Sequence, residues 1–318
     1  RPGAGAHSHD AHGRPRAPAA AGTIITTSRL GVTRTLVTFA NSAVVVDAVG
    51  TEAERLVTFL FHRITPVASI APHAEIEVHA DSARLDYRLR LNGAPFCTSD
   101  SPAALATALL GQVLFHLVDR SSGGLAIHAA AVAIGTRVAL FPGVSGAGKT
   151  TLTAWLATRG FEYLTDELVF IPDGSETVVP FPRPLVVKAA ARTAIAEHVV
   201  ALDEGDAVLH GRETTLVDPL LLGAAPSPAG LTLATVVFPT FQAGADRVSE
   251  TLTRSEAGAG LMGGLINARN LPAHGFPAVA ALARRVPAMR LRYGQFGDLS
   301  SWIDDLRATL AAGTPESH

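Results

Sequence analysis

Apolar residues recur along this chain with two different spacings, and together they predict an α/β protein. In the first third, short runs alternate apolar and polar residues with the period of two that is typical of half-buried strands. Two stretches, residues 51–63 and about 102–119, repeat apolar residues at helical intervals, and Ser101 and Pro102 give the second a polar cap and a proline in its first turn. Strands are predicted at residues 23–27, 34–39, 43–46, 75–79 and 84–91, the last followed by the hairpin turn Asn92-Gly93.

The rest of the chain continues the alternation of strands and helices. Residues 125–134 form a β-type run, and Gly135-Thr136 joins it in a tight hairpin to the buried run 138–141. Further strands are predicted at 161–171, 178–188, 231–238 and 288–293, with a polar strand or loop at 207–217. Helices are predicted at 151–159, 189–202, 255–269, 277–284 and 299–311, with a linker-like break at 226–230.

Residues 143–150 read GVSGAGKT and fit the pattern G-x-x-x-x-G-K-[ST] of a phosphate-binding loop. A predicted strand precedes the loop and a predicted helix follows it, closed by Gly160. In such a loop Lys149 reaches the β- and γ-phosphates, and the Thr150 hydroxyl is a Mg²⁺ ligand. The nucleotide-binding residues are therefore predicted to be Gly143, Ser145, Gly146, Ala147, Gly148, Lys149, Thr150 and Thr151.

Two adjacent acids, Asp166 and Glu167, interrupt the apolar run 161–171. Carboxylates inside an apolar strand are unfavourable unless they face a cation or take part in proton transfer. Neighbours on an extended strand point to opposite faces, so both acids can act together only if the strand breaks locally. Thr165 before them and Leu168 after them allow such a break.

Several basic residues are candidates for the acceptor side of the site. We expect some of them to line the acceptor site or to bind the transferred phosphate, although each could equally be a solvated charge. His128 lies in the run beside the loop strand, on one face with Ala126 and Ala130, and a core histidine is the alternative. The remaining candidates are Arg183, Lys188, His210 and Arg212.

Composition limits the class of protein. The formal net charge of −2 in 318 residues argues against a general nucleic-acid binder. The single cysteine, Cys97, excludes a disulfide framework and a cysteine-rich metal site, and it is consistent with a reducing cytoplasm. The longest apolar stretch, residues 104–118, is interrupted by Gln112 and His116, so we expect it to be too short and too polar to span a membrane.

The motifs together resemble the catalytic core of HPr kinase/phosphorylase. The matching residues are Ile127-His128-Ala129-Ala130, 143–151, Gly160 and Thr165-Asp166-Glu167, within about residues 125–190. The resemblance is closer to HPr-kinase-related proteins of bacterial peptide-biosynthesis clusters, including kinases of lasso-peptide precursors. It implies the P-loop fold shared with phosphoenolpyruvate carboxykinase, with a mixed sheet. The predicted organisation is a disordered tail over 1–22, a small α+β section over 23–122 and a P-loop kinase domain over 123–318.

The resemblance also implies an activity. It predicts an ATP- and Mg²⁺-dependent kinase that acts on a hydroxyl, most simply a serine of a peptide or protein. Lys149 and His128 would be catalytic, Asp166 would be the base, and Glu167 would join Thr150 on the Mg²⁺ side; HPr kinase has two aspartates where this chain has Asp-Glu. A small-molecule kinase and a nucleotide-binding regulatory protein with little turnover are the alternatives, and a homo-oligomer is compatible with each.

Overall fold

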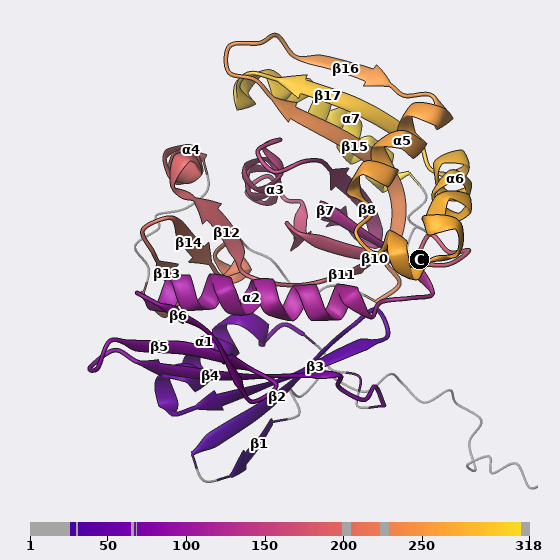
Figure 1. Ribbon diagram of the computed structural model, residues 1–318. Helices are drawn as coiled ribbons and strands as arrows, with labels where there is room; N and C mark the ends of the chain where they lie inside the picture. Colours follow the sequence, from indigo (N-terminus) through magenta and orange to yellow (C-terminus); the bar gives the residue numbers. More distant parts are fainter. Residues whose placement is uncertain are drawn as a thin grey trace, which may run out of the picture.

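The computed structural model describes residues 26–29, 31–64, 67, 69–198, 205–222 and 229–312, which form a mixed α/β fold with three β-sheets (Figure 1). The α/β class predicted from the hydrophobic pattern is confirmed. The tail expected over residues 1–22 lies outside the described residues, as does most of the break expected at 226–230.

The N-terminal sheet has six strands in chain order, β1-β2-β3-β4-β5-β6. Neighbouring strands are antiparallel except β3 and β4, which are parallel and are joined by α1 (Thr51–Phe61). Asn92 and Gly93 both have positive φ, as their predicted hairpin turn requires. The strands are β1 (Thr26–Arg29), β2 (Val32–Phe39), β3 (Ser42–Val49), β4 (Ala74–Asp81), β5 (Asp86–Leu91) and β6 (Ala94–Ser99).

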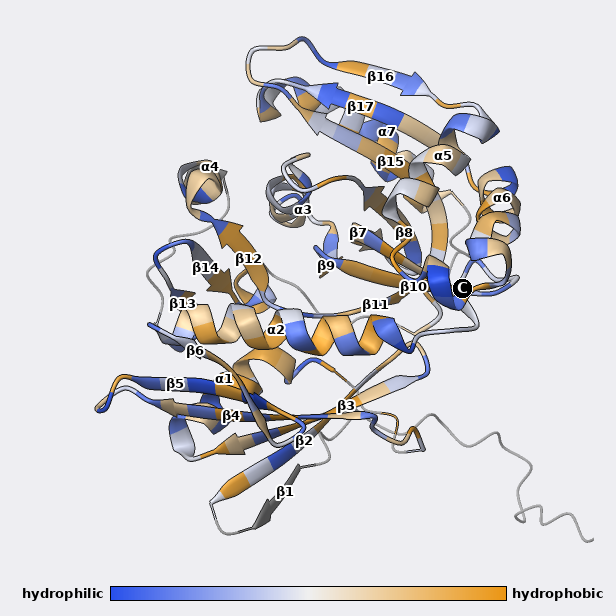
Figure 2. Ribbon diagram, viewed as in Figure 1, coloured by the Kyte–Doolittle hydropathy of each residue, from blue (hydrophilic) through white to orange (hydrophobic). Residues whose placement is uncertain are grey.

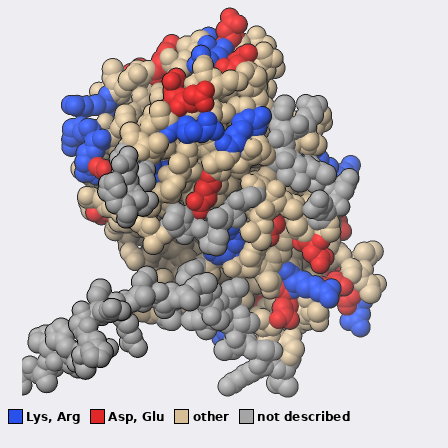
Figure 3. All heavy atoms as spheres, turned by 180° about the vertical axis from the view of Figure 1, so that it is seen from behind, with Lys and Arg blue, Asp and Glu red and all other residues tan. Residues whose placement is uncertain are grey.

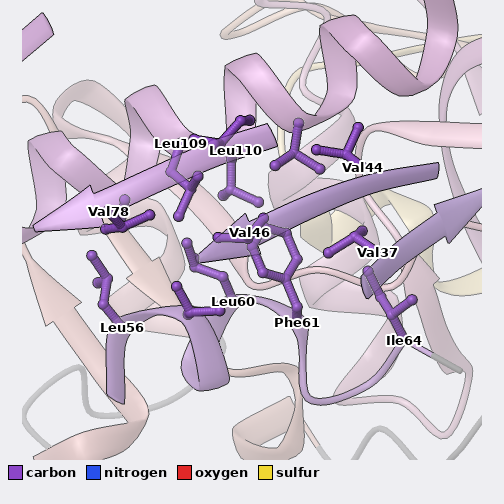
Figure 4. Packing of buried hydrophobic residues seen from close by; sticks show 14 of the residues in the cluster. Val37, Val44, Val46, Leu56, Leu60, Phe61, Ile64, Val78, Leu109 and Leu110 are labelled. Atoms are coloured by element: carbon purple, nitrogen blue, oxygen red, sulfur yellow. The ribbon is translucent and has the colours of Figure 1, made fainter. Parts of the chain in front are cut away.

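One face of this sheet is buried under two helices, α1 and α2 (Pro102–Asp119). Val44 and Val46 of β3 meet Leu60 of α1 and Leu109 and Leu110 of α2 (Figure 4). Figure 2 shows the resulting contrast between hydrophobic stretches of α2 and hydrophilic residues along β5. The alternation in the strands therefore places this core where the period-two pattern predicts it.

α2 begins as the sequence predicts, with the Ser101 hydroxyl accepting from the backbone N–H of Ala104 at 3.3 Å. By length and composition alone it is the one helix in the described chain that could cross a membrane, whereas we expected the stretch to be too short and too polar. The helix takes in apolar positions beyond residues 104–118 and so reaches 18 residues. Seven of its residues are buried, and its contacts include the N-terminal sheet and β14.

Charged side chains cover the opposite face of the N-terminal sheet. Arg34 bridges Asp47 at 2.6 Å and Glu75 at 3.0 Å across neighbouring strands. Both signs of charge are also interspersed over the face of the molecule shown in Figure 3. The small net charge is thus the near balance of 26 basic and 28 acidic side chains, which together make up 17% of the residues.

The large sheet has the order β11-β10-β7-β8-β15-β17-β16, with β9 paired to β7. β7 and β8 are antiparallel neighbours, and the predicted hairpin at Gly135-Thr136 is confirmed. β8, β15 and β17 are parallel, so their carboxyl ends lie at one edge. The strands are β7 (Gly124–Ile134), β8 (Arg137–Pro142), β9 (Glu162–Thr165), β10 (Leu168–Pro172), β11 (Val179–Pro180), β15 (Thr232–Phe241), β16 (Val248–Thr251) and β17 (Ala288–Tyr293).

The run predicted as one strand over residues 161–171 is two strands, β9 and β10, which both pair with β7. The prediction of one continuous strand is therefore wrong: Asp166 and Glu167 lie in a bend between the two strands, which is the condition under which both acids can act together. The run 178–188 is likewise divided, because prolines at 182 and 184 cannot donate to a ladder. Its second part, β12 (Leu185–Lys188), belongs to a small sheet with β14 (Thr214–Val217) and β13 (Val208–His210).

The C-terminal helices cover the large sheet: α5 (Arg254–Gly264), α6 (Phe276–Arg285) and α7 (Ser300–Ala311). The prediction that the first of these extends to residue 269 is wrong. The chain leaves the helix because Leu265 bridges Ile127 of β7 and the Ile266 N–H donates to the carbonyl of Ala126 at 2.9 Å. A short helix, α4 (Arg192–His198), covers part of the predicted helix 189–202, whose end lies outside the described residues.

Candidate functional site

The predicted phosphate-binding loop leads from β8 directly into α3 (Lys149–Ala157). Gly146 and Gly148 have φ of 93° and 88°, in the left-handed region that glycine adopts readily. The helix begins at Lys149, two residues earlier than predicted, and ends before Gly160. Strand, curled loop and helix N-terminus therefore follow one another in the arrangement that lets backbone N–H groups converge on an anion.

Lys149 turns its side chain back toward the start of the loop. Its Nζ donates to the carbonyl oxygens of Gly143 at 2.6 Å and Val144 at 3.1 Å, and it lies 3.1 Å from Nε2 of His128. Burial lowers the pKa of Lys149, and the nearby carboxylates, Glu167 foremost, oppose that effect. A cation is thus held where the loop, β7 and the acidic pair meet.

His128 connects this lysine with the second acid of the pair. Its Nδ1 lies 3.2 Å from Oε1 of Glu167, while its Nε2 faces Lys149. Burial acts to raise the pKa of Glu167, but the hydrogen bond from His128 and the charge of Arg183 outweigh it and lower that pKa to about 2. Glu167 is therefore an ionised carboxylate at neutral pH, and 34% of its side chain is exposed.

Asp166, in contrast, is almost fully buried. One of its oxygens accepts from the Thr150 hydroxyl at 3.1 Å, and the other accepts from the Tyr163 hydroxyl at 3.3 Å and from Nε of Arg183 at 3.0 Å. Burial raises the pKa of Tyr163 well above its usual value, which keeps the phenol protonated as a donor. The first acid thus faces the helix that carries Thr150, away from the exposed side of the site.

Arg183 joins the two acids. Its Nε reaches Asp166, and its Nη2 donates to Oε2 of Glu167 at 2.8 Å. Its side chain is 8% exposed, so a buried guanidinium fixes both carboxylates from behind. The structure therefore places Arg183 inside the predicted site, as a support for the acids rather than as an exposed contact.

The other three basic candidates divide into two groups. Lys188, at the end of β12, donates to the Ser145 hydroxyl of the loop at 2.6 Å. His210 and Arg212 are exposed on and after β13, and within the described chain neither side chain contacts the loop. The structure thus brings Lys188 to the loop and leaves His210 and Arg212 in the small sheet.

Tyr163 and Phe241 are site neighbours that the sequence analysis missed. Tyr163 is one aromatic residue in an apolar run, and its hydrogen bond to Asp166 arises only because the chain bends after Thr165. Phe241 ends β15, and its N–H donates to the carbonyl of Ala147 in the loop at 3.3 Å. The sequence signal that could have identified Phe241 is its position at the carboxyl end of a predicted strand, where ligands bind in α/β sheets.

The donors present fit Mg²⁺ together with a nucleotide. Among the residues that the structure describes, no group of three or more His, Cys, Asp or Glu side chains could hold a metal alone. Mg²⁺ characteristically takes one or two protein oxygens and completes its shell with phosphate and water, which suits the Thr150 hydroxyl and one neighbouring carboxylate. Comparisons with protein-family models and with curated proteins find no match to this chain.

Proposed function

We propose that this protein is an ATP- and Mg²⁺-dependent phosphotransferase with a P-loop core of the HPr kinase type, acting on a hydroxyl group. The observation that carries the proposal is the meeting of Lys149, His128 and Glu167 at the start of the glycine-rich loop. Phosphoryl transfer depends mainly on positioning and on neutralising charge, and these residues supply a cation and an oriented carboxylate at one place.

The β7–β8 hairpin that enters the loop supports this type of core. Thr150 and its partner Asp166 would hold Mg²⁺. When bound, the ion neutralises phosphate charge and orients the phosphate chain. The chain's own groups then have distinct tasks: loop N–H groups and Lys149 bind phosphate oxygens, and His128 orients Glu167.

The contacts favour the opposite division of the two acids from the one that the family resemblance implies. Asp166 is buried and bonded to the Thr150 hydroxyl, which suits the Mg²⁺ side. Glu167 is more exposed and is held by His128, which suits the acceptor hydroxyl. Its low pKa makes it a weak base, so its service is to orient the hydroxyl and accept the proton late in the transfer.

A peptide or protein is the acceptor that the surroundings favour. Two apolar side chains near this end of the loop are exposed, Val144 at 77% and Ile266 at 44%. Ile266 lies beside β7 through its bond to Ala126, two residues from His128. Contiguous apolar surface beside a polar centre marks macromolecular contact, and we infer that these two side chains contribute to such a surface. The free thiol of Cys97 and the use of ATP are compatible with a cytoplasmic location.

Incubation with ATP labelled on its γ-phosphate tests the function. The expected result is Mg²⁺-dependent transfer of label to a serine-containing peptide or protein encoded near this protein's gene. Label transferred to a metabolite would identify a small-molecule kinase. Slow release only to water, with tight nucleotide binding, would identify a regulatory protein and contradict the proposal.

Titration with Mg²⁺ tests the division of the acids. We expect Glu167→Gln to lower kcat by about 10²- to 10⁴-fold while leaving the Mg²⁺ requirement unchanged. Asp166→Asn should raise the Mg²⁺ concentration needed for half-maximal activity. The reverse pattern would restore the roles that the resemblance implies, and normal turnover in both variants would remove the acids from the mechanism.

A further inference from the structure

Phe241 is an exposed aromatic residue that lies directly against the phosphate-binding loop. It is 45% exposed at the end of β15. A Cβ built on Gly148 would lie 3.0 Å from the Cβ of Phe241, so ring and loop are packed as closely as glycine allows. The hydrogen bond from its N–H to Ala147 fixes this approach. An exposed apolar ring is thus built into the wall of a polar loop.

The positions of the reacting groups indicate on which side of the loop the terminal phosphate of a nucleotide would lie. His128 and the acidic pair lie on the β7, β9 and β10 side of the loop strand, so the phosphate that reacts belongs on that side. Phe241 lies on the opposite side, where β15 runs parallel to β8 about 4.8 Å away. A nucleotide whose terminal phosphate meets Lys149 therefore extends its nucleoside toward the carboxyl ends of β15 and β17.

The Phe241 ring is held in place from beneath by Tyr293, which ends β17. The two ring centroids are 5.5 Å apart with planes at 62°. Tyr293 is fully buried, and its hydroxyl has no hydrogen-bond partner within the described chain although it lies 3.1 Å from the position of a Cβ on Gly148. A buried hydroxyl beside the loop is thus available to a ligand or water that enters there.

We propose that Phe241 is the platform on which the nucleobase of ATP stacks, supported by Tyr293. This inference rests on the proposed nucleotide-dependent function and adds the site for the base. Stacking on an aromatic ring suits any base because every base has a π-face, so the platform supplies affinity and direction more than selectivity among bases. The phosphates would be bound by the loop and the base by the end of β15.

Comparing ATP with inorganic triphosphate isolates the contribution of the base. In isothermal titration calorimetry with Mg²⁺ present, the wild-type protein should bind ATP more tightly than inorganic triphosphate. Phe241→Ala should weaken ATP binding by about 5- to 100-fold and leave triphosphate binding unchanged. Phe276→Ala removes another exposed phenylalanine, 65% exposed on α6, and serves as the matched control with no effect on either ligand.

A second variant keeps an aromatic side chain at position 241. Phe241→Trp should retain the affinity for ATP, and ATP but not triphosphate should change the fluorescence of the new indole. Both native tryptophans are buried, so their background should change little. Equal losses of ATP and triphosphate binding in Phe241→Ala, or an unchanged ATP affinity, would overturn the platform while the proposed function stands. Wild-type protein that binds neither ligand would overturn both.

Discussion

Burial disfavours the charged form of Lys149. Because its folded pKa is lowered, the folded protein binds fewer protons than the unfolded chain between that value and the ordinary lysine value. Stability therefore rises with pH through this window, and below it the charged lysine destabilises the fold. Lys149→Met should abolish nucleotide binding while the thermal midpoint at pH 7 stays equal to or above that of the wild type. A lower midpoint, or normal ATP affinity, would contradict this view of the lysine.

Arg183 is the buried cation that pairs with both carboxylates, of which Asp166 is almost fully buried. Removing one partner of a buried ion pair leaves an uncompensated charge, so Arg183→Met should lower the free energy of unfolding by about 3–5 kcal/mol. Adding Asp166→Asn removes that stranded charge and should recover part of the loss. Urea unfolding of both variants measures this, and a double variant as unstable as the sum of its single changes would count against the pairing.

At the scale of elements, β7 and β10 approach one another at a position that only glycine fits. A Cβ on Gly124 would lie 2.4 Å from the carbonyl oxygen of Ile171 and 2.8 Å from the Cα of Pro172. Gly124→Ala should therefore destabilise by about 1–3 kcal/mol. Gly111→Ala in α2, where a Cβ meets nothing within 4 Å, should stabilise by about 0.5–1 kcal/mol. Chemical denaturation that ranks the two variants the other way would contradict this packing.

Elements set by local sequence could be predicted, whereas elements set by tertiary contact could not. The glycine-rich loop and the hairpin before it follow from residue type and spacing, whereas the sequence predicts residues 161–171 as one strand, with a break at Asp166 only as the condition for both acids to act. The early end of α5 depends on the pairing of Leu265 with β7, across more than a hundred residues, and β16 is a polar edge strand with no apolar alternation. For the same reason the burial of Arg183 and the packing of Phe241 could not be read from the sequence.

At the scale of the whole molecule, the N-terminal section supports the site through Phe39. Its ring packs edge-on against the rings of Phe170 and Phe181, with centroid distances of 6.1 Å and 5.5 Å respectively. Phe170 follows Glu167 by three residues, and Phe181 precedes Arg183 by two. One buried cluster therefore joins the first sheet to the segments that carry the acids and their arginine.

This shared core predicts one cooperative unfolding transition for the whole described chain. Phe39→Ala should lower the single transition by about 3–5 kcal/mol and also reduce turnover, because the segment that carries Arg183 loses its support. Phe96→Ala, at a ring 46% exposed on β6, is the matched control and should do neither. Two separate calorimetric transitions, with only the first shifted by Phe39→Ala, would show that the sections unfold independently.

β7 is bonded along both edges near its middle, by β8 on one side and β9 on the other. Each amide there donates toward one of these neighbours, and because that neighbour separates from β7 only when the sheet around β7 opens, we expect exchange to require global unfolding. The loop residues 144–146 are exposed and have no such protection. The two sides of the site should thus differ by orders of magnitude in exchange rate, with His128 on the slowly exchanging strand and residues 144–146 on the rapidly exchanging side.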